Sequence, residues 1–270
     1  MPIIFQAKTR EGYIFKILAE LLHHNIQTAC FEIDKDGIKL QMMDHERLIL
    51  IDLILNAEKF TMYKYNQTNK MYLGINMRHF YQMLKPIKKK DSIHLVIDSE
   101  NLEDLVINVI PKENNRLTSS TIKIQTIQNI DIDIPSDYDN SIIISSGEFQ
   151  KMCKGLATIS NITRVVSKGC MIKFSNDDGG VMKRCTEFGE IENKDDDEDN
   201  DEYDENFDSK QLIRVTKLAG LSQNMRIYTK KDAPLLIKSD IGILGYISVY
   251  LKSESMREAD SIMESEYNNE

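Results

Sequence analysis

The sequence predicts an α+β protein of two similar domains, each built from antiparallel strands and short helices. One observation is a stretch near the middle of the 270-residue chain, residues 122–135, where apolar and polar residues alternate for most of the length. Alternation with period two is typical of an extended chain with one buried side. Because the stretch ends at Pro135 and turn-forming residues follow it, we interpret residues 121–135 as a long extended connector between domains 1–120 and 136–253.

The second observation is that the predicted elements follow the same order on both sides of the connector. Each side begins with a strand, an amphipathic helix, another strand, a glycine-containing turn and a returning strand. Gly12 and Lys16 of the first helix match Gly147 and Lys151 of the later one at the same offset. A similar but less clear unit of helix and strands follows within each half. The chain therefore has four predicted short helices, at residues 11–24, 78–87, 146–160 and 209–222. The repetition indicates two pseudo-equivalent domains.

Charge is distributed unevenly along the chain. The net charge is -9, but residues 187–208 hold thirteen acidic residues against one lysine, and residues 254–270 hold six against one arginine. The remainder of the chain is therefore basic. Acidic runs of this kind are usually solvated, so we expect an acidic loop at 187–208 and a flexible tail at 254–270. A specific acidic docking site is the alternative for the loop.

Each predicted helix has cations on a face that the core does not use. For a single helix, a solvated surface is the simpler interpretation. Recurrence in four helices of an acidic chain favours a basic surface that faces a polyanion, although Glu20 weakens the pattern on the first helix. No base-reading motif accompanies the cations, so a nucleic acid would be bound through its phosphates without sequence preference.

Motifs of nucleotide-binding and hydrolytic enzymes are absent from the sequence. Two carboxylate sets could suggest a metal-dependent nuclease: Asp131 with Asp133, and Asp44 with His45 and Glu46. Their predicted positions in the connector and in a turn favour solvated side chains over a two-metal site. The cysteines lack zinc-site spacing, and no apolar run is long enough for a bilayer. We therefore expect an intracellular protein without metal, cofactor or membrane.

Five segments carry a resemblance to one family, in the family's order and at nearly its spacing. They are residues 37–53, residues 146–156, Ile134-Pro135, Asp232 to Leu235, and Tyr250-Leu251. On these segments the chain resembles the eukaryotic-type DNA sliding clamp, proliferating cell nuclear antigen, over roughly residues 2–253. The bias toward Ile, Asn, Asp and Lys resembles a clamp encoded by an AT-rich genome, such as that of a large DNA virus or a protist.

The resemblance implies a non-enzymatic homotrimeric ring around double-stranded DNA. Such a ring is placed by a clamp loader and recruits DNA polymerase and other replication and repair proteins that carry a clamp-binding peptide. Its expected location is the nucleus or a viral replication site. One alternative keeps the fold but makes the chain a subunit of a checkpoint-type clamp or a clamp-like viral transcription factor. The metal-dependent nuclease is an alternative from another class.

The resemblance also implies two sets of site residues, and the predicted sheet edges suggest a third. The DNA-facing residues are Lys16, Lys85, Lys151, Lys154, Lys210 and Lys217. The pocket for the partner peptide is formed by Met43, Leu48, Leu50, Ile132, Ile134, Pro135, Pro234, Tyr250 and Leu251. Because unpaired sheet edges are adhesive, we expect the subunits to join through edge strands at 116–121 and 181–185, which include Arg116, Thr118, Thr121, Val181, Lys183 and Cys185. The chain departs from the family pattern at Ile17 and at Lys252-Ser253.

Overall fold

The computed structural model describes residues 3–113, 116–128, 130, 132–138, 141–189 and 203–267. The first half of the chain forms β1 (Ile3–Thr9), α1 (Gly12–Asn25), β2 (Thr28–Ile33), β3 (Gly37–Met43), β4 (Ile49–Asn56), the 3-10 helix η1 (Ala57–Lys59), β5 (Met62–Tyr65), β6 (Met71–Asn76), α2 (Met77–Leu84), β7 (Ser92–Asp98), β8 (Asp104–Ile110) and β9 (Thr118–Lys123). The second half forms β10 (Ser141–Ser145), α3 (Ser146–Leu156), β11 (Ile162–Lys168), β12 (Met171–Asp177), β13 (Lys183–Gly189), β14 (Tyr203–Asp208), α4 (Ser209–Arg214), the 3-10 helix η2 (Thr216–Gly220), β15 (Asn224–Tyr228), β16 (Leu235–Ile241), β17 (Gly245–Leu251) and α5 (Glu254–Tyr267).

The two halves repeat one arrangement, which confirms the predicted α+β fold. The order β10, α3, β11, β12, β13 repeats β1, α1, β2, β3, β4. The order β14, α4, β15, β16, β17 then repeats β6, α2, β7, β8, β9. Among the described residues, which leave out 190–202 between β13 and β14, strand β5 and helix α5 have no counterpart in the other half.

Three sheets form the fold, and the largest of them crosses from one half to the other. The sheets have the orders β5-β1-β7-β8-β9, β10-β15-β16-β17-β4-β3-β2-β6 and β13-β12-β11-β14. Strand β17 pairs with β4 in antiparallel register, from Gly245 opposite Leu55 to Leu251 opposite Ile49. This pairing makes one continuous sheet, and we call it the internal joint.

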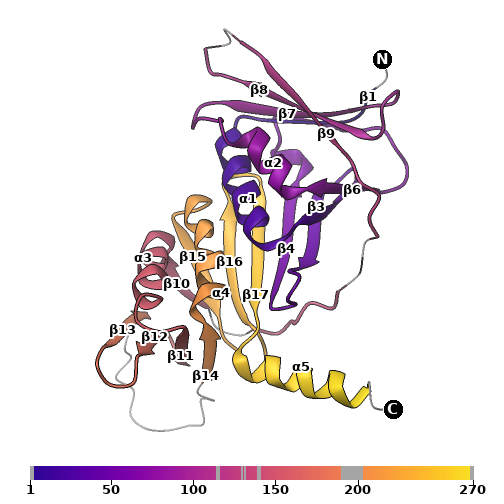
Figure 1. Ribbon diagram of the computed structural model, residues 1–270. Coiled ribbons are helices and arrows are strands. Elements are labelled where there is room, and N and C mark those ends of the chain that lie inside the picture. The colour runs from indigo at the N-terminus through magenta and orange to yellow at the C-terminus, as the bar shows by residue number, and fades with distance from the viewer. Residues whose placement is uncertain are drawn as a thin grey trace.

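Helices α1 to α4 lie together on one side of the sheets (Figure 1). Helix α1 contacts α2, α4 and η2, and α3 contacts α4 and η2, so the layer continues across the internal joint. Apolar residues of α1, among them Phe15, Leu18 and Leu22, are buried against the strands below. An amphipathic helix is held in this way mainly by burial of its apolar face.

The connector is extended, but it is a strand only as far as Lys123. Beyond that point one isolated bridge joins Gly74 of β6 to Gln125. A Cβ atom at Gly74 would approach the carbonyl oxygen of Gln125 to 2.3 Å, so glycine permits the crossing. The expected extended connector is thus hydrogen-bonded as a strand only in its first part, because among the described residues no strand lies beside its second part to complete a ladder.

Two acidic segments contain more regular structure than we expected. Strand β14 occupies the end of the predicted 187–208 loop, where buried Tyr203 and Phe207 alternate with exposed polar residues. Strand β13 also extends into the start of that loop, as far as Gly189. In place of a flexible tail, residues 254–267 form helix α5. The hydroxyl oxygen of Ser253 accepts a hydrogen bond from the Met256 amide at 3.4 Å at the start of this helix, as an N-cap does.

Asp44 links the turn after β3 to helix α4 of the other half. Its side chain has 0% exposure, and its Oδ1 atom accepts hydrogen bonds from the amides of Leu48 at 2.8 Å and Ile49 at 3.0 Å. Its Oδ2 atom accepts one from Arg214 Nη2 at 2.7 Å. Both oxygens of the carboxylate therefore accept hydrogen bonds from the protein. The Arg214 guanidinium is bound to this carboxylate and is not part of an exposed cationic surface.

We expect Asp44→Asn to lower the free energy of unfolding by about 3 kcal/mol, because it leaves the Arg214 guanidinium facing an amide in a buried setting. Urea denaturation at neutral pH measures this change. Glu46→Gln is the matched control: Glu46 also contacts Arg214, at 3.2 Å, but its side chain is 51% exposed. That control should cost less than about 1 kcal/mol. Equal losses in the two variants would contradict a special role for Asp44.

Candidate functional site

The helix layer presents three lysines that have no acidic partner among the described residues. Lys85 caps the C-terminus of α2, Lys154 lies in the last turn of α3, and Lys210 lies in the first turn of α4. All three are exposed. Within the described part of the chain, no carboxylate lies within 4 Å of their ammonium groups. They are thus available to an external anion.

The other three predicted DNA-facing lysines have partners within the protein. Lys16 Nζ donates to the carbonyl of Ile87 at 3.3 Å. Lys151 Nζ contacts Glu148 Oε1 at 2.8 Å, and this hydrogen bond raises the pKa of Lys151. Lys217 lies in η2, and its ammonium group is 2.6 Å from Glu20 Oε1 on α1. The glutamate that weakened the sequence pattern therefore forms an ion pair between the two halves.

A second surface feature is a small apolar cluster outside the main core. Its buried members are Leu50 of β4, Leu236 of β16 and Tyr250 of β17, and Met43, Ile132, Ile134, Tyr138 and Tyr228 pack against them half-buried. We call this set the connector cluster, because the connector supplies two of its residues. The predicted alternation holds there: Ile132 and Ile134 are half-buried, whereas Asp133 between them is exposed. Asp131 lies outside the described residues.

Tyr138 anchors the chain after the connector to this cluster. Its hydroxyl donates a hydrogen bond to the carbonyl of Pro234 at 2.7 Å. Its ring lies 6.3 Å from that of Tyr228 and 6.4 Å from that of Tyr250. Burial raises the pKa of Tyr138, and burial followed by the charge of Asp52 raises the pKa of Tyr250 to about 12. Both phenols therefore stay neutral hydrogen-bond donors at physiological pH.

The structure revises the predicted pocket in two ways. Leu251 is fully buried in the main core and Leu48 packs against that core, so neither belongs to the connector cluster. Successive residues of a strand point to opposite faces. Of the neighbouring residues Tyr250 and Leu251, only Tyr250 therefore faces the cluster. Sequence reasoning missed Leu236, Tyr138 and Tyr228. The apolar run 235–237 indicated a strand buried on both faces, which could have identified Leu236. Pro135 and Pro234 are half-buried at the edge of the cluster.

Among the terminal strands of the three described sheets, two match the predicted subunit edges. Strand β9 is the last strand of the five-stranded sheet, and β13 is the last strand of the four-stranded sheet. Thr118 and Thr121 lie in β9, with Arg116 just before it, and Lys183 and Cys185 lie in β13. Of the predicted interface residues, Thr118, Thr121, Lys183 and Cys185 thus lie on edge strands.

Val181 precedes strand β13 instead of belonging to it. It lies in the turn before the strand, where its amide donates to Asp178 Oδ1 at 3.0 Å. Its side chain is 87% exposed. A substitution at Val181 would therefore alter a turn and leave the ladder of the edge strand in place.

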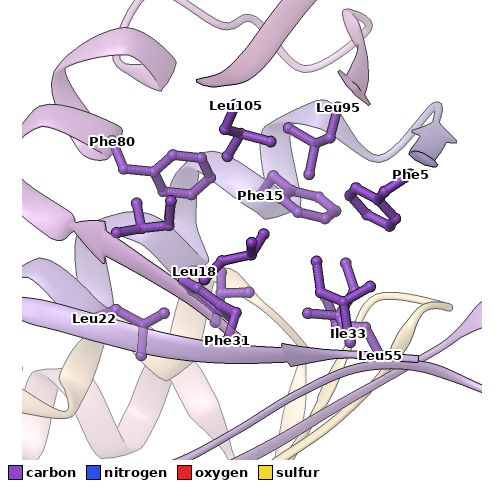
Figure 2. A pocket seen from close by; sticks show the side chains of 13 residues that line it. Phe5, Phe15, Leu18, Leu22, Phe31, Ile33, Leu55, Phe80, Leu95 and Leu105 are labelled. Carbon is purple, nitrogen blue, oxygen red and sulfur yellow. The ribbon is translucent and has the colours of Figure 1, made fainter. Parts of the chain in front are cut away.

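Enclosed space in the first domain does not form a ligand site. Figure 2 shows side chains from α1, α2 and the strands converging on a cavity of about 40 Å³, among them Phe15, Phe80 and Leu105. All its lining residues are apolar, and it is far smaller than pockets for small molecules. In the described parts of the chain, no three His, Cys, Asp or Glu residues are grouped as a metal site. No described helix is both long and apolar enough to cross a bilayer.

Comparison with known proteins identifies relatives along nearly the whole chain. Residues 4–135 match the N-terminal domain family of proliferating cell nuclear antigen, and residues 133–254 match the C-terminal domain family. The chain is 27% identical over 251 residues to the probable DNA polymerase sliding clamp 1 of Paramecium bursaria Chlorella virus 1, covering 90% of this chain and 94% of that protein. It is 25% identical over 256 residues to the proliferating cell nuclear antigen of Caenorhabditis elegans, covering 92% and 96%. The corresponding protein of Chaetomium thermophilum is 24% identical over 256 residues, with 92% and 97% covered.

Proposed function

Because the chain belongs to the proliferating cell nuclear antigen family through both of its domains, we propose that it acts as a homotrimeric sliding clamp around double-stranded DNA. In this role it holds a DNA polymerase on its template and recruits further replication and repair proteins. A clamp loader places it on DNA, in the nucleus or at a viral replication site. Members of this family are processivity factors and not enzymes, so the metal-dependent nuclease is no longer an alternative.

The observation that carries the proposal is the internal joint. In the repeated arrangement, β9 is the counterpart of β17, and β13 is the counterpart of β4. Strands β17 and β4 pair within the chain, whereas β9 and β13 have no partner on their outer edges in the described part of the chain. The chain therefore contains one completed joint and the two unlike halves of a second. A head-to-tail contact of unlike edges closes into a ring if the rotation closes.

The internal joint also predicts the register between subunits. When the match of Gly12 with Gly147 is extended through the paired strands, Gly245 becomes the counterpart of Arg116. When the β3–β4 pair is matched to the β12–β13 pair, Phe188 becomes the counterpart of Leu55. Gly245 lies opposite Leu55 in the internal joint. We therefore expect Arg116 of one subunit opposite Phe188 of the next, with the two strands antiparallel.

The helix layer supports contact with DNA. Lys85, Lys154 and Lys210 are exposed cations on neighbouring helices of one layer, and helices that line the inner side of a ring would turn them toward the duplex. Contacts between lysines and phosphates are independent of sequence and weaken with salt. They suit a protein that moves along DNA.

The connector cluster supports partner recruitment. It is apolar, lies apart from the main core, and has two phenols that remain neutral. A helical peptide turn that buries aliphatic and aromatic side chains there gains about 2 to 3 kcal/mol for each fully buried aromatic ring. Peptide recognition by apolar anchors of this kind is common.

A subunit of a heteromeric checkpoint-type clamp, or a clamp-like transcription factor, would have the same fold. The mass of the purified protein in solution distinguishes these alternatives from the proposed clamp. A trimer formed by this chain alone supports the proposal. A monomer at micromolar concentration that assembles only with other chains would overturn it.

Two proline variants in β13 test the joint between subunits. Successive amides of an antiparallel strand point to opposite sides. Of the variants Cys185→Pro and Thr186→Pro, one therefore loses a hydrogen bond to β12, and the other loses a hydrogen bond to the neighbouring subunit. We expect one variant to be a monomer with nearly unchanged thermal stability. The other should be the less stable protein. Sedimentation combined with thermal melts measures both properties. Two variants that both melt normally as trimers would contradict the joint.

Reversing the charges of the three unpaired helix lysines tests the DNA-facing layer. We expect Lys85→Glu combined with Lys154→Glu and Lys210→Glu to shorten the lifetime of the ring on circular DNA at least about tenfold, because three phosphate contacts become repulsive. The matched control reverses Lys35, Lys64 and Lys168, which are exposed on strands and turns. Retention on DNA at several salt concentrations is the measurement. Equal retention by the test and control variants would refute the assignment.

A single substitution in the connector tests the partner site. Ile132→Asp should weaken binding of a peptide of the form Gln-x-x-aliphatic-x-x-aromatic-aromatic at least about thirtyfold, since a charge replaces an apolar wall. Ile130→Asp is the matched control, because Ile130 lies in the same connector but is 70% exposed. Calorimetric titration gives the affinities, and thermal melts exclude unfolding. Unchanged affinity in a well-folded Ile132 variant would show that the peptide binds elsewhere.

A further inference from the structure

A basic cleft lies beside the start of edge strand β9. It has a volume of about 690 Å³ and is lined by Lys88, Lys89, Lys90, Asp91, Pro111, Lys112, Glu113 and Arg116. Its walls are the turn between α2 and β7 and the chain between β8 and β9. Ser92 at the start of β7 lies opposite Ile110 at the end of β8, and Val109 lies opposite Thr118 of β9. These registers place the cleft at one end of the sheet, directly beside the open edge.

The cations of the cleft are not neutralised within the described chain. Five of its lining residues are basic and two are acidic. Asp91 is buried, and its Oδ2 atom accepts a hydrogen bond from the amide of Lys88 at 3.0 Å, so it shapes the turn. The cleft lysines and Arg116 are exposed, and no described carboxylate forms an ion pair with any of them. The cleft is thus suited to a flexible polyanion.

The chain contains a polyanion that begins at the complementary edge. Residues 190–202 hold nine acidic residues and one lysine, and they follow directly after Gly189, the last residue of β13. In the register expected above, Phe188 lies opposite Arg116 of the next subunit. In the proposed ring, the acidic segment therefore begins, at the end of β13, beside the basic cleft of the next subunit.

The internal joint shows that contact continues past the end of the paired strands. There the amide of Asn56 donates to the carbonyl of Leu244 at 2.8 Å. Asn56 is the counterpart of Gly189, and Leu244 precedes the first residue of β17. In the proposed ring, the equivalent contact joins the amide of Gly189 to the turn before β9 of the next subunit, and that turn forms one wall of the cleft.

We propose that the acidic segment 190–202 of one subunit docks in the basic cleft of the next and strengthens the joint between them. This inference rests on the ring described under Proposed function. The segment is tethered to the adjacent strand, so its effective concentration at the cleft is high whenever the ring is closed. DNA is the competing polyanion. The segment is favoured because it is covalently tethered to the strand beside the cleft, whereas DNA is not.

Charge reversal on each side of the joint tests the proposal. The cleft variant is Lys89→Glu with Lys90→Glu, the segment variant is Asp195→Lys with Asp196→Lys, and a third protein combines all four changes. The matched control is Lys35→Glu with Lys64→Glu, two exposed lysines away from the cleft. Ring dissociation is followed by single-molecule mass measurement at nanomolar concentration, in about 50 mM and 500 mM salt. The lifetime of each ring on circular DNA is measured in parallel.

We expect the cleft and segment variants each to raise the dissociation constant of the ring about tenfold at low salt. The effect should shrink to about twofold at high salt, because exposed charges are screened. The combined protein should return to within about threefold of the wild type, and the control should not change. Such a rescue identifies the two groups as partners.

Each other outcome overturns the proposal in a distinguishable way. If the wild-type protein forms no trimer, the proposed clamp fails and the docking fails with it. If the wild type is a trimer but the cleft variant behaves as the control, the ring stands and the docking is refuted. If the cleft variant only shortens retention on DNA, the cleft is a DNA contact. If the combined protein is not rescued, the segment is not the occupant.

Discussion

The pairing of β17 with β4 is the constraint on which the rest of the structure depends. It turns two similar halves into one sheet, and it brings their helices into a single layer that is fastened by the Lys217–Glu20 ion pair. The same pairing separates the two faces of the sheet. On β17, Leu251 enters the main core while Tyr250 joins the connector cluster. The connector cluster and the main core are thus built from adjacent residues of one strand, with the helix layer on the opposite side.

Much of the fold follows from patterns that are local in sequence. Alternating apolar residues, glycine turns and the repeated order of elements indicated two related halves of antiparallel strands and short helices. The same alternation showed that Ile132 and Ile134 share a side of the connector. These inferences succeed because side-chain direction in an extended chain has a fixed period, whatever the chain packs against.

The remainder depends on contacts between residues far apart in the sequence. Whether a lysine on a helix faces solvent or an acid is decided by the opposite half of the chain, as Lys217 with Glu20 illustrates. Tyr138 joins the connector cluster through the distant carbonyl of Pro234, which no local pattern indicates. Helix α5 formed where composition suggested a flexible tail. It begins at a serine N-cap, and Ser255 donates a hydrogen bond to Glu205 of the distant strand β14.

The connector gives the two kinds of joint different responses to dilution. Within the chain, β17 and β4 are tied together covalently, so their contact is unimolecular and its strength does not depend on protein concentration. An equivalent contact between β9 and β13 of separate chains lacks such a tie and follows mass action. In a ring of these subunits, β17–β4 pairs that cannot dissociate would therefore alternate with β9–β13 pairs of similar geometry that can. The places where the ring can part to admit a DNA strand are then set by where the polypeptide is continuous, and only secondarily by how well each pair of edges fits.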